Sequence, residues 1–151
     1  MAMKTLEKTD DLPCKAYRAF METMRLDTLD QLDVLAAPDI HFHDPFYDVR
    51  GVAAVKEVFR KTFRDVEQPV FYVTDCACSG RVCFLRWHFT CRPRVFSKGH
   101  PWVVDGITEL VYDEFGRVRE HADYWDAGHY VYERIPLVNV LVRAVKRRIT
   151  R

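Results

Sequence analysis

The sequence predicts an α+β protein in which helices come first and a curled antiparallel sheet follows. Up to about residue 65, apolar residues recur at spacings of three and four, which is typical of one helix face. From Pro69 onward they alternate with a period of two, which is typical of strands. Helices segregated from an antiparallel sheet define the α+β class. A length of 151 residues suits one domain, so we expect residues 1–151 to form a single unit.

The first helix is predicted to begin near Pro13. Asp10 and Asp11 can cap it, and a proline in the first turn loses no hydrogen bond. Leucines continue the helical pattern until Pro38 ends it. The apolar face of the first helix consists of Tyr17, Phe20 and Met24.

A short strand over residues 39–44 and a loop over 46–50 are expected to follow. Gly51 then opens another helix, in which apolar and basic residues take opposite sides. We expect the basic side, which begins with Lys56, to face solvent. The apolar side consists of Val55, Phe59 and Phe63.

Four longer strands are predicted over residues 70–78, 82–91, 102–113 and 117–125. Ser79-Gly80 and the segment 114–116 provide the turns, because glycine accepts the backbone angles that tight turns require. These strands follow one another closely, so we expect them to form an antiparallel meander.

The C-terminal segment, residues 137–151, is predicted to be a basic amphipathic helix. The whole chain has a net charge of only +1, which argues against a nucleic-acid partner. Five of its positive charges nevertheless gather in this segment, which contains no acidic residue: Arg143, Lys146, Arg147, Arg148 and Arg151. We expect its apolar stripe to pack over the body or against a partner subunit. Contact with an anionic membrane is the alternative.

Five cysteines occur without a Cys-x-x-Cys pair, and no secretory leader precedes them. We therefore expect free thiols in a cytoplasmic protein, and no zinc site. No run of about 18 apolar residues is present, so no membrane span is expected. The cysteines are Cys14, Cys76, Cys78, Cys83 and Cys91.

The long strands carry polar residues on faces that also hold apolar bulk. One face of strand 82–91 is entirely apolar and includes Trp87 and Phe89, whereas the other includes Arg86 and His88. We expect the mixed face to line a cavity. The apolar face is then expected to lie outside, where Trp87 and Phe89 would support a homodimer. On strand 117–125 the face that holds ionisable residues contains Arg119, His121, Asp123 and Trp125.

Two segments resemble the SnoaL-like branch of the nuclear transport factor 2-like superfamily, which includes polyketide cyclases, ketosteroid isomerase relatives and limonene epoxide hydrolase. They are Arg117-Val-Arg-Glu-His-Ala-Asp-Tyr-Trp-Asp126 and His43-Asp-Pro-Phe-Tyr-Asp-Val-Arg-Gly51. The order of elements over about residues 13–130 agrees with that family. The resemblance implies a cone, in which a strongly curved sheet wraps around the N-terminal helices and leaves a deep apolar pocket. It also implies that dimers are frequent.

The resemblance implies catalytic roles for several residues. Asp123 occupies the position of the water-activating base of the epoxide hydrolase, and Arg86 occupies that of its arginine. His88 stands where that enzyme has a second carboxylate, and Asp44 where it has an amide, so its catalytic set is incomplete here. We expect Asp123 or His88 to act as the base, Arg86 to orient it, and Asp44 and His121 to assist.

Simpler interpretations of these residues remain open. Asp44 can be a turn residue, Arg86 and Asp123 a structural ion pair, and His88 and His121 ordinary core histidines. His41 and His43 alternate on one strand like metal ligands, but we predict no metal because the resemblance places the opposite face inward.

The functional hypothesis is a cofactor-independent isomerase, cyclase, dehydratase or hydrolase that acts on a small hydrophobic, oxygenated molecule. Aromatic residues make up 13% of the chain, and many of them are expected to wall the pocket. The alternative is a non-catalytic module that binds a ligand or a protein. The expected wall residues are Phe42, Tyr47, Phe59, Phe63, Phe84, Trp102 and Trp125.

Overall fold

A computed structural model describes residues 12–95 and 100–150, and it confirms the α+β class. The expected caps Asp10 and Asp11 lie outside the described residues. The helices are α1 (Leu12–Thr23), α2 (Leu32–Leu35), α3 (Val52–Asp65), α4 (Ala127–Tyr130) and α5 (Val138–Ile149), with 3-10 turns at Leu29–Gln31 and Tyr132–Arg134. The strands are β1 (Ala36–His43), β2 (Asp48–Arg50), β3 (Val66–Ser79), β4 (Val82–Pro93), β5 (Trp102–Tyr112) and β6 (Val118–Trp125).

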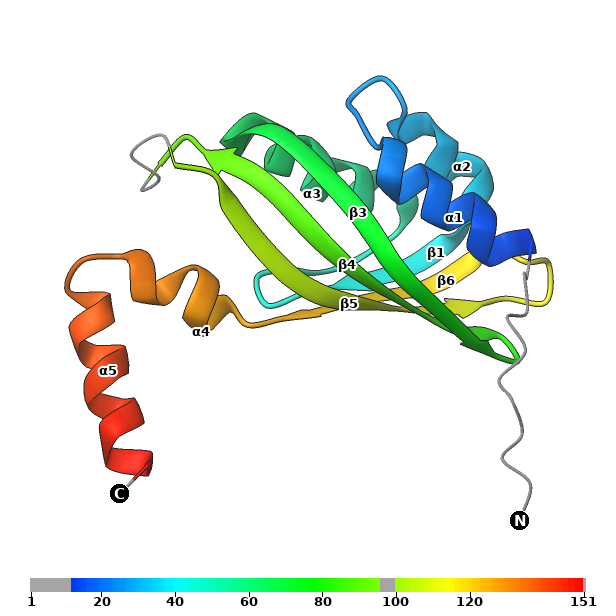
Figure 1. The fold of residues 1–151 in the computed structure, drawn as a ribbon. Coiled ribbons are helices and arrows are strands. Elements are labelled where there is room, and N and C mark those ends of the chain that lie inside the picture. The colour runs from blue at the N-terminus through cyan, green and yellow to red at the C-terminus, as the bar shows by residue number, and fades with distance from the viewer. Residues whose placement is uncertain (1–11, 96–99, 151) are drawn as a thin grey trace, which may run out of the picture.

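The six strands form one sheet in the order β2-β1-β6-β5-β4-β3. The meander β3 to β6 is antiparallel, as predicted, but β1 pairs with β6 in parallel, so the sheet is mixed. Long strands β3, β4 and β5 curve across the molecule, and α1, α2 and α3 lie on one side of the sheet (Figure 1). The strong curvature follows from the twist that every β-strand carries.

Two local predictions near β1 were wrong. The strand begins at Ala36 and includes Pro38, which was expected to stop a helix. Proline is accepted close to the start of a strand, where its missing N–H does not interrupt the ladder. The expected loop also contains β2, which pairs Asp48 with His43 across a tight turn.

The core lies between the helices and the inner face of the sheet. Tyr17, Phe20 and Val55 are buried, as their helical spacing predicted. The buried side chains of β4 all belong to the wholly apolar face: Cys83, Leu85, Trp87 and Cys91. The expectation that this face lies outside was therefore wrong. The curved sheet turns its most apolar face toward the helices, because that arrangement removes the largest apolar area from water.

A second correction concerns Lys56, which was expected to face solvent. Its side chain is only 10% exposed, and its Nζ lies 2.8 Å from Asp30 Oδ1 and 2.7 Å from Asp33 Oδ2. The hydrogen bonds that Lys56 donates to these carboxylates raise its pKa, so it stays charged. The pair of contacts ties α3 to the 3-10 turn and α2.

The C-terminal helix α5 extends away from the sheet (Figure 1). None of its residues is buried, so the expected packing over the body is not found. Among the described residues no helix is long and apolar enough to cross a membrane.

Gly106 allows a close approach between β4 and β5. A Cβ atom at this position would lie 2.3 Å from Cη2 and 2.4 Å from Cζ2 of Trp87, so the indole ring covers the glycine directly. The two residues are cross-strand partners. Only glycine leaves enough space for the ring to lie flat on the strand.

We predict that Gly106→Ala destabilises the protein by about 1–3 kcal/mol, because the indole ring must move out of a packed core. Urea unfolding monitored by circular dichroism measures this change. A Trp87→Leu background provides the control, since the shorter side chain leaves room for the new methyl group. An equal cost in both backgrounds would show that the ring contact is not the cause.

Candidate functional site

A cavity of about 510 Å³ opens between α3 and the inner face of the sheet. All three tryptophans of the chain lie in its wall. Six of the aromatic residues predicted from the sequence also line it: Phe42, Tyr47, Phe59, Phe63, Trp102 and Trp125. Phe84 does not, because it belongs to the outer face of β4 and is 42% exposed.

Asp123 on β6 is the polar centre of this cavity. Its Oδ1 accepts a hydrogen bond from Thr108 Oγ1 at 2.5 Å and lies 3.0 Å from Nε2 of His121. Both bonds end on the same oxygen. Among residues 12–95 and 100–150, no hydrogen bond reaches Oδ2. The second oxygen of Asp123 is therefore available to a molecule in the cavity.

The donors on Asp123 are themselves held by buried groups. Trp87 Nε1 lies 2.8 Å from Thr108 Oγ1, and an indole nitrogen can only donate. Thr108 therefore directs its own hydroxyl hydrogen at Asp123. The exposed fraction of Thr108 is 0% and that of His121 is 1%, so water cannot replace these contacts.

Tyr17 on α1 determines the tautomer of His121. Its hydroxyl lies 2.8 Å from Nδ1 of His121. Burial, followed by the charge of Asp123, raises the pKa of Tyr17 well above its ordinary value, so the phenol remains protonated and donates. Nδ1 is then the acceptor, and the hydrogen on Nε2 points to Asp123.

A β-bulge in β6 brings His121 to the inner face. Tyr112 pairs with Val118 and Val111 with Glu120, which leaves Arg119 as the extra residue. Val118 and His121 are consequently both buried, whereas Arg119 is exposed. Simple alternation from the sequence had placed Arg119 and His121 on one face.

Asp44 is a second carboxylate in the cavity wall. Its Oδ1 accepts hydrogen bonds from the backbone N–H groups of Phe46 and Tyr47, so the expected turn role is correct as well. Burial is the main cause that raises the pKa of Asp44, and the charge of Asp123 adds to it. A carboxyl group with a raised pKa can supply a proton near neutral pH more readily than an ordinary aspartate.

Arg86 and His88 do not reach the cavity. Both lie on the outer face of β4, where Arg86 Nη1 is 3.8 Å from Asp75 Oδ2 and His88 Nδ1 contacts Asp105 Oδ1. The hydrogen bond from His88 lowers the pKa of Asp105. The expected convergence of Arg86 and His88 with Asp123 is therefore wrong, because these residues belong to the opposite face of the strand from Trp87.

Because the apolar face of β4 lies inside the protein, the surface on which the homodimer prediction was based is not exposed. Trp87 and Phe89 line the cavity and are not exposed to a partner. The dimer stays a prediction, and the outer face of the sheet offers it a different set of exposed apolar side chains: Tyr72, Phe84, Val103, Ile107 and Tyr124.

Three residues that support Asp123 and His121 were not predicted from the sequence: Thr108, Tyr17 and Trp87. For Thr108 a signal was present, because alternation along β5 places it among otherwise apolar inward positions. No signal existed for Tyr17, which is separated from His121 by 104 residues and meets it only through the fold.

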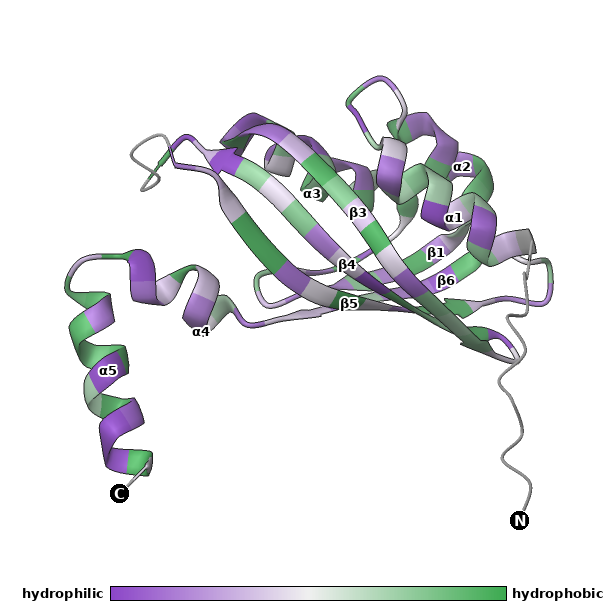
Figure 2. Cartoon of the chain, viewed as in Figure 1, coloured by the Kyte–Doolittle hydropathy of each residue, from purple (hydrophilic) through white to green (hydrophobic). Residues whose placement is uncertain are grey.

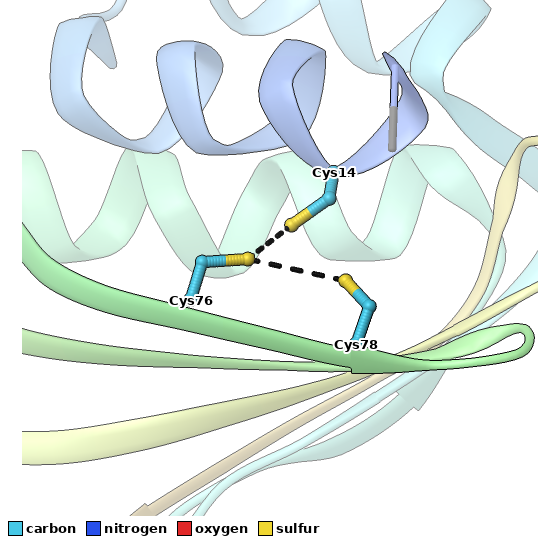
Figure 3. A group of neighbouring side chains, drawn as sticks. All are labelled: Cys14, Cys76 and Cys78. Carbon is cyan, nitrogen blue, oxygen red and sulfur yellow. Dashed lines mark hydrogen bonds between the residues drawn. The ribbon is translucent and has the colours of Figure 1, made fainter. Parts of the chain in front are cut away.

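A separate cluster of cysteines joins α1 to the β3–β4 hairpin. The Sγ atoms of Cys14, Cys76 and Cys78 lie within 4.8 Å of one another (Figure 3). Cys78 also forms a disulfide with Cys83, its partner across the hairpin, so the expectation of free thiols was wrong for this pair. A sulfur in a disulfide is not a thiolate, and structural zinc sites need four ligands. With this disulfide formed, the cluster does not offer a zinc site.

Cys91 is the cysteine that lines the cavity. Burial raises the pKa of its thiol to about 11. At neutral pH the thiol is therefore protonated, and it is a poor nucleophile. Three carboxylates line the cavity: Asp123, Asp44 and Asp65. Asp65 is exposed at the end of α3, so the ionisable chemistry of the less exposed wall rests on Asp123 and Asp44.

The comparisons with known proteins identify the family. A model of the SnoaL-like domain matches residues 17–121, which is more than half of the chain, so the protein belongs to the SnoaL-like family. The resemblance noted in the sequence is confirmed. None of the curated proteins matches the sequence significantly.

Solved structures show the same fold at low sequence identity. A protein with a ketosteroid isomerase-like fold from Catenulispora acidiphila, solved with trimethylamine, has a TM-score of 0.67 and 15% identity, over 81% of this chain and 90% of that one. An LEH-like epoxide hydrolase of M. tuberculosis has a TM-score of 0.64 and 16% identity, over 89% of this chain and 96% of that one. An NTF2-like protein of unknown function from Exiguobacterium has a TM-score of 0.63 and 17% identity, over 76% of this chain and 98% of that one.

We predict that Thr108→Val lowers the free energy of unfolding by about 1–3 kcal/mol, because the N–H of Trp87 is left buried without an acceptor. Thr90→Val is the matched control, since Thr90 lies on the outer face of the neighbouring strand β4. Urea unfolding of both variants measures the difference. If Thr108→Val costs no more than Thr90→Val, the chain of hydrogen bonds is not structurally important.

Asp44→Asn tests the raised pKa of Asp44. The amide oxygen can still accept the two backbone hydrogen bonds, but the side chain remains neutral at every pH. Because the folded pKa lies above the unfolded value of 3.8, the wild-type carboxyl stabilises the fold below that pH and loses this contribution as pH rises through the folded pKa. We therefore expect the variant to gain stability relative to wild type as pH rises from about 4 through the folded pKa of Asp44. A constant difference across this range would contradict the prediction.

Proposed function

We propose that the protein is a cofactor-independent acid–base enzyme that acts on a small, hydrophobic, oxygenated molecule in the cavity. The observation that carries this proposal is the arrangement around Asp123. Its Oδ1 accepts the hydrogen bonds from Thr108 and His121, which are both buried. Its Oδ2 has no hydrogen-bond partner among the described residues, and Asp123 lines an apolar cavity. Such a carboxylate is positioned to take a proton from a bound molecule or a water.

The wall of the cavity suits this chemistry. A volume of about 510 Å³ lies within the usual range for small-molecule sites. Aromatic and aliphatic side chains exclude water, which strengthens every electrostatic interaction inside. Asp44 is a second ionisable group in the same wall, and its raised pKa makes it the candidate proton donor. A base and an acid with different environments form a usable pair.

The alternative, a binding module without catalysis, would gain support from an Asp123 neutralised by a cation. Arg86, the cation expected at this position, lies on the outer face instead. The donors on Asp123 are a hydroxyl and an imidazole, which hold the carboxylate in place through one of its oxygens. A structural neighbour described as an epoxide hydrolase is consistent with a proton-transfer or water-addition reaction.

We predict that Asp123→Asn abolishes catalysis but preserves binding. Cyclic enones and aryl β-diketones in D₂O report proton abstraction by NMR, and aryl epoxides report water addition. Turnover of any active probe should fall by ~100-fold or more, which is the usual contribution of a general base. Fluorescence of the three cavity tryptophans should still report binding.

Asp105→Asn is the matched control for this experiment. Asp105 is an aspartate on the outer face of the sheet, where it contacts His88 and not the cavity. It should retain the turnover of the wild type. Undiminished turnover in Asp123→Asn would show that Asp123 is not the base. Quenching of the tryptophans without turnover of any probe would favour the binding module.

A further inference from the structure

Helix α5 presents an apolar side that no part of the described protein covers. The most exposed apolar side chains of this segment are Leu137 at 82%, Ile149 at 77% and Leu141 at 69%. Val140 and Val145 are exposed as well. Figure 2 shows hydrophobic and hydrophilic bands alternating along this helix. An apolar stripe of this size on an isolated helix requires a partner in solution.

The remaining circumference of α5 is basic. Lys146, in the last turn of α5, forms an ion pair with Glu133 of the preceding 3-10 turn. Within the described residues no acidic side chain pairs with Arg143, Arg147 or Arg148, and all three are exposed. The segment 137–151 contains no aspartate or glutamate. Its positive field is therefore not neutralised from within.

We infer that α5 binds the surface of an anionic lipid bilayer, lying in the interface with its apolar stripe among the acyl chains. A helix with a large apolar face, a strongly basic polar face and no acidic residue is suited to this position. A negative lipid surface neutralises the arginines, and their long stems can keep the charges at the headgroups.

A second copy of the chain is a poorer occupant of this helix. Two α5 helices in contact would bring four basic residues of each copy close together, with no acidic residue in either helix to pair with them. Like charges at such distances destabilise an interface. Charge complementarity therefore favours an anionic lipid surface over a second copy of the chain.

The attachment of α5 allows it to reach a flat surface. Pro136 and Leu137, which has a positive φ of 71°, redirect the chain immediately before the helix. The segment that precedes them is held on the body, because the guanidinium of Arg134 lies 4.4 Å from the ring centroid of Trp102. The helix is consequently presented away from the sheet on an anchored base (Figure 1).

Co-sedimentation of the full chain with vesicles tests this inference. We expect binding to vesicles of phosphatidylcholine mixed with phosphatidylglycerol, weaker binding at high salt, and little binding to phosphatidylcholine alone. Leu141→Glu combined with Val145→Glu should abolish binding. Arg143→Glu combined with Arg147→Glu should weaken it by ~25-fold or more, since each basic residue contributes about a fivefold factor.

The control is Arg50→Glu combined with Arg81→Glu, which changes the net charge equally at two exposed arginines of the body. It should bind as the wild type does. Because all three tryptophans line the cavity, an unchanged emission spectrum shows that the body of each variant is folded. No binding to the anionic vesicles at low salt would overturn the inference, as would equal losses in the control. A dimer in light scattering that Leu141→Glu with Val145→Glu dissociates, without vesicle binding, would assign α5 to a second copy instead.

Discussion

The burial of the Asp123 carboxylate in an apolar wall is the constraint on which this site depends. A charged group in such a place is costly unless donors compensate it. Here the donors come from a chain of buried hydrogen bonds that starts at Trp87 on one side and at Tyr17 on the other. The chain connects α1, β4, β5 and β6, so the same contacts that stabilise the carboxylate also fix the relative positions of these elements. A network whose buried donors are all paired favours one arrangement of the core.

The curvature of the sheet creates the space that this carboxylate serves. Strands β3 to β6 turn their apolar face toward the helices, and α3 does not fill the hollow completely. Gly106 lets the Trp87 ring lie against the strand, which leaves its N–H directed at Thr108. His121 and Asp123 lie side by side because they are two residues apart in the regular part of β6, beyond the β-bulge at Arg119. Packing and chemistry are therefore coupled at single residues, and a change in either is expected to affect both.

Charge is divided between two parts of the molecule. The body carries the inward-facing carboxylates and, outside residues 143–151, a small excess of acidic over basic residues. The C-terminal helix carries only positive charges and an uncovered apolar stripe. The same chain thus combines a pocket for a hydrophobic molecule with a helix suited to an anionic surface. The overall charge of +1 conceals this division.

From the amino-acid sequence we could predict the α+β class, the antiparallel meander and three of the inward polar residues, namely Asp123, His121 and Asp44. Periodicity and the two segments that resemble the family, residues 43–51 and 117–126, were sufficient for these, because both are local properties of the chain. Local periodicity sorts the residues of a strand into two faces without saying which face is inside. For that reason only the tertiary structure placed Arg86 and His88 on the outside of β4. It also supplied Tyr17 and Thr108, whose contacts with His121 and Asp123 span 104 and 15 residues and exist only once the sheet has curved around the helices.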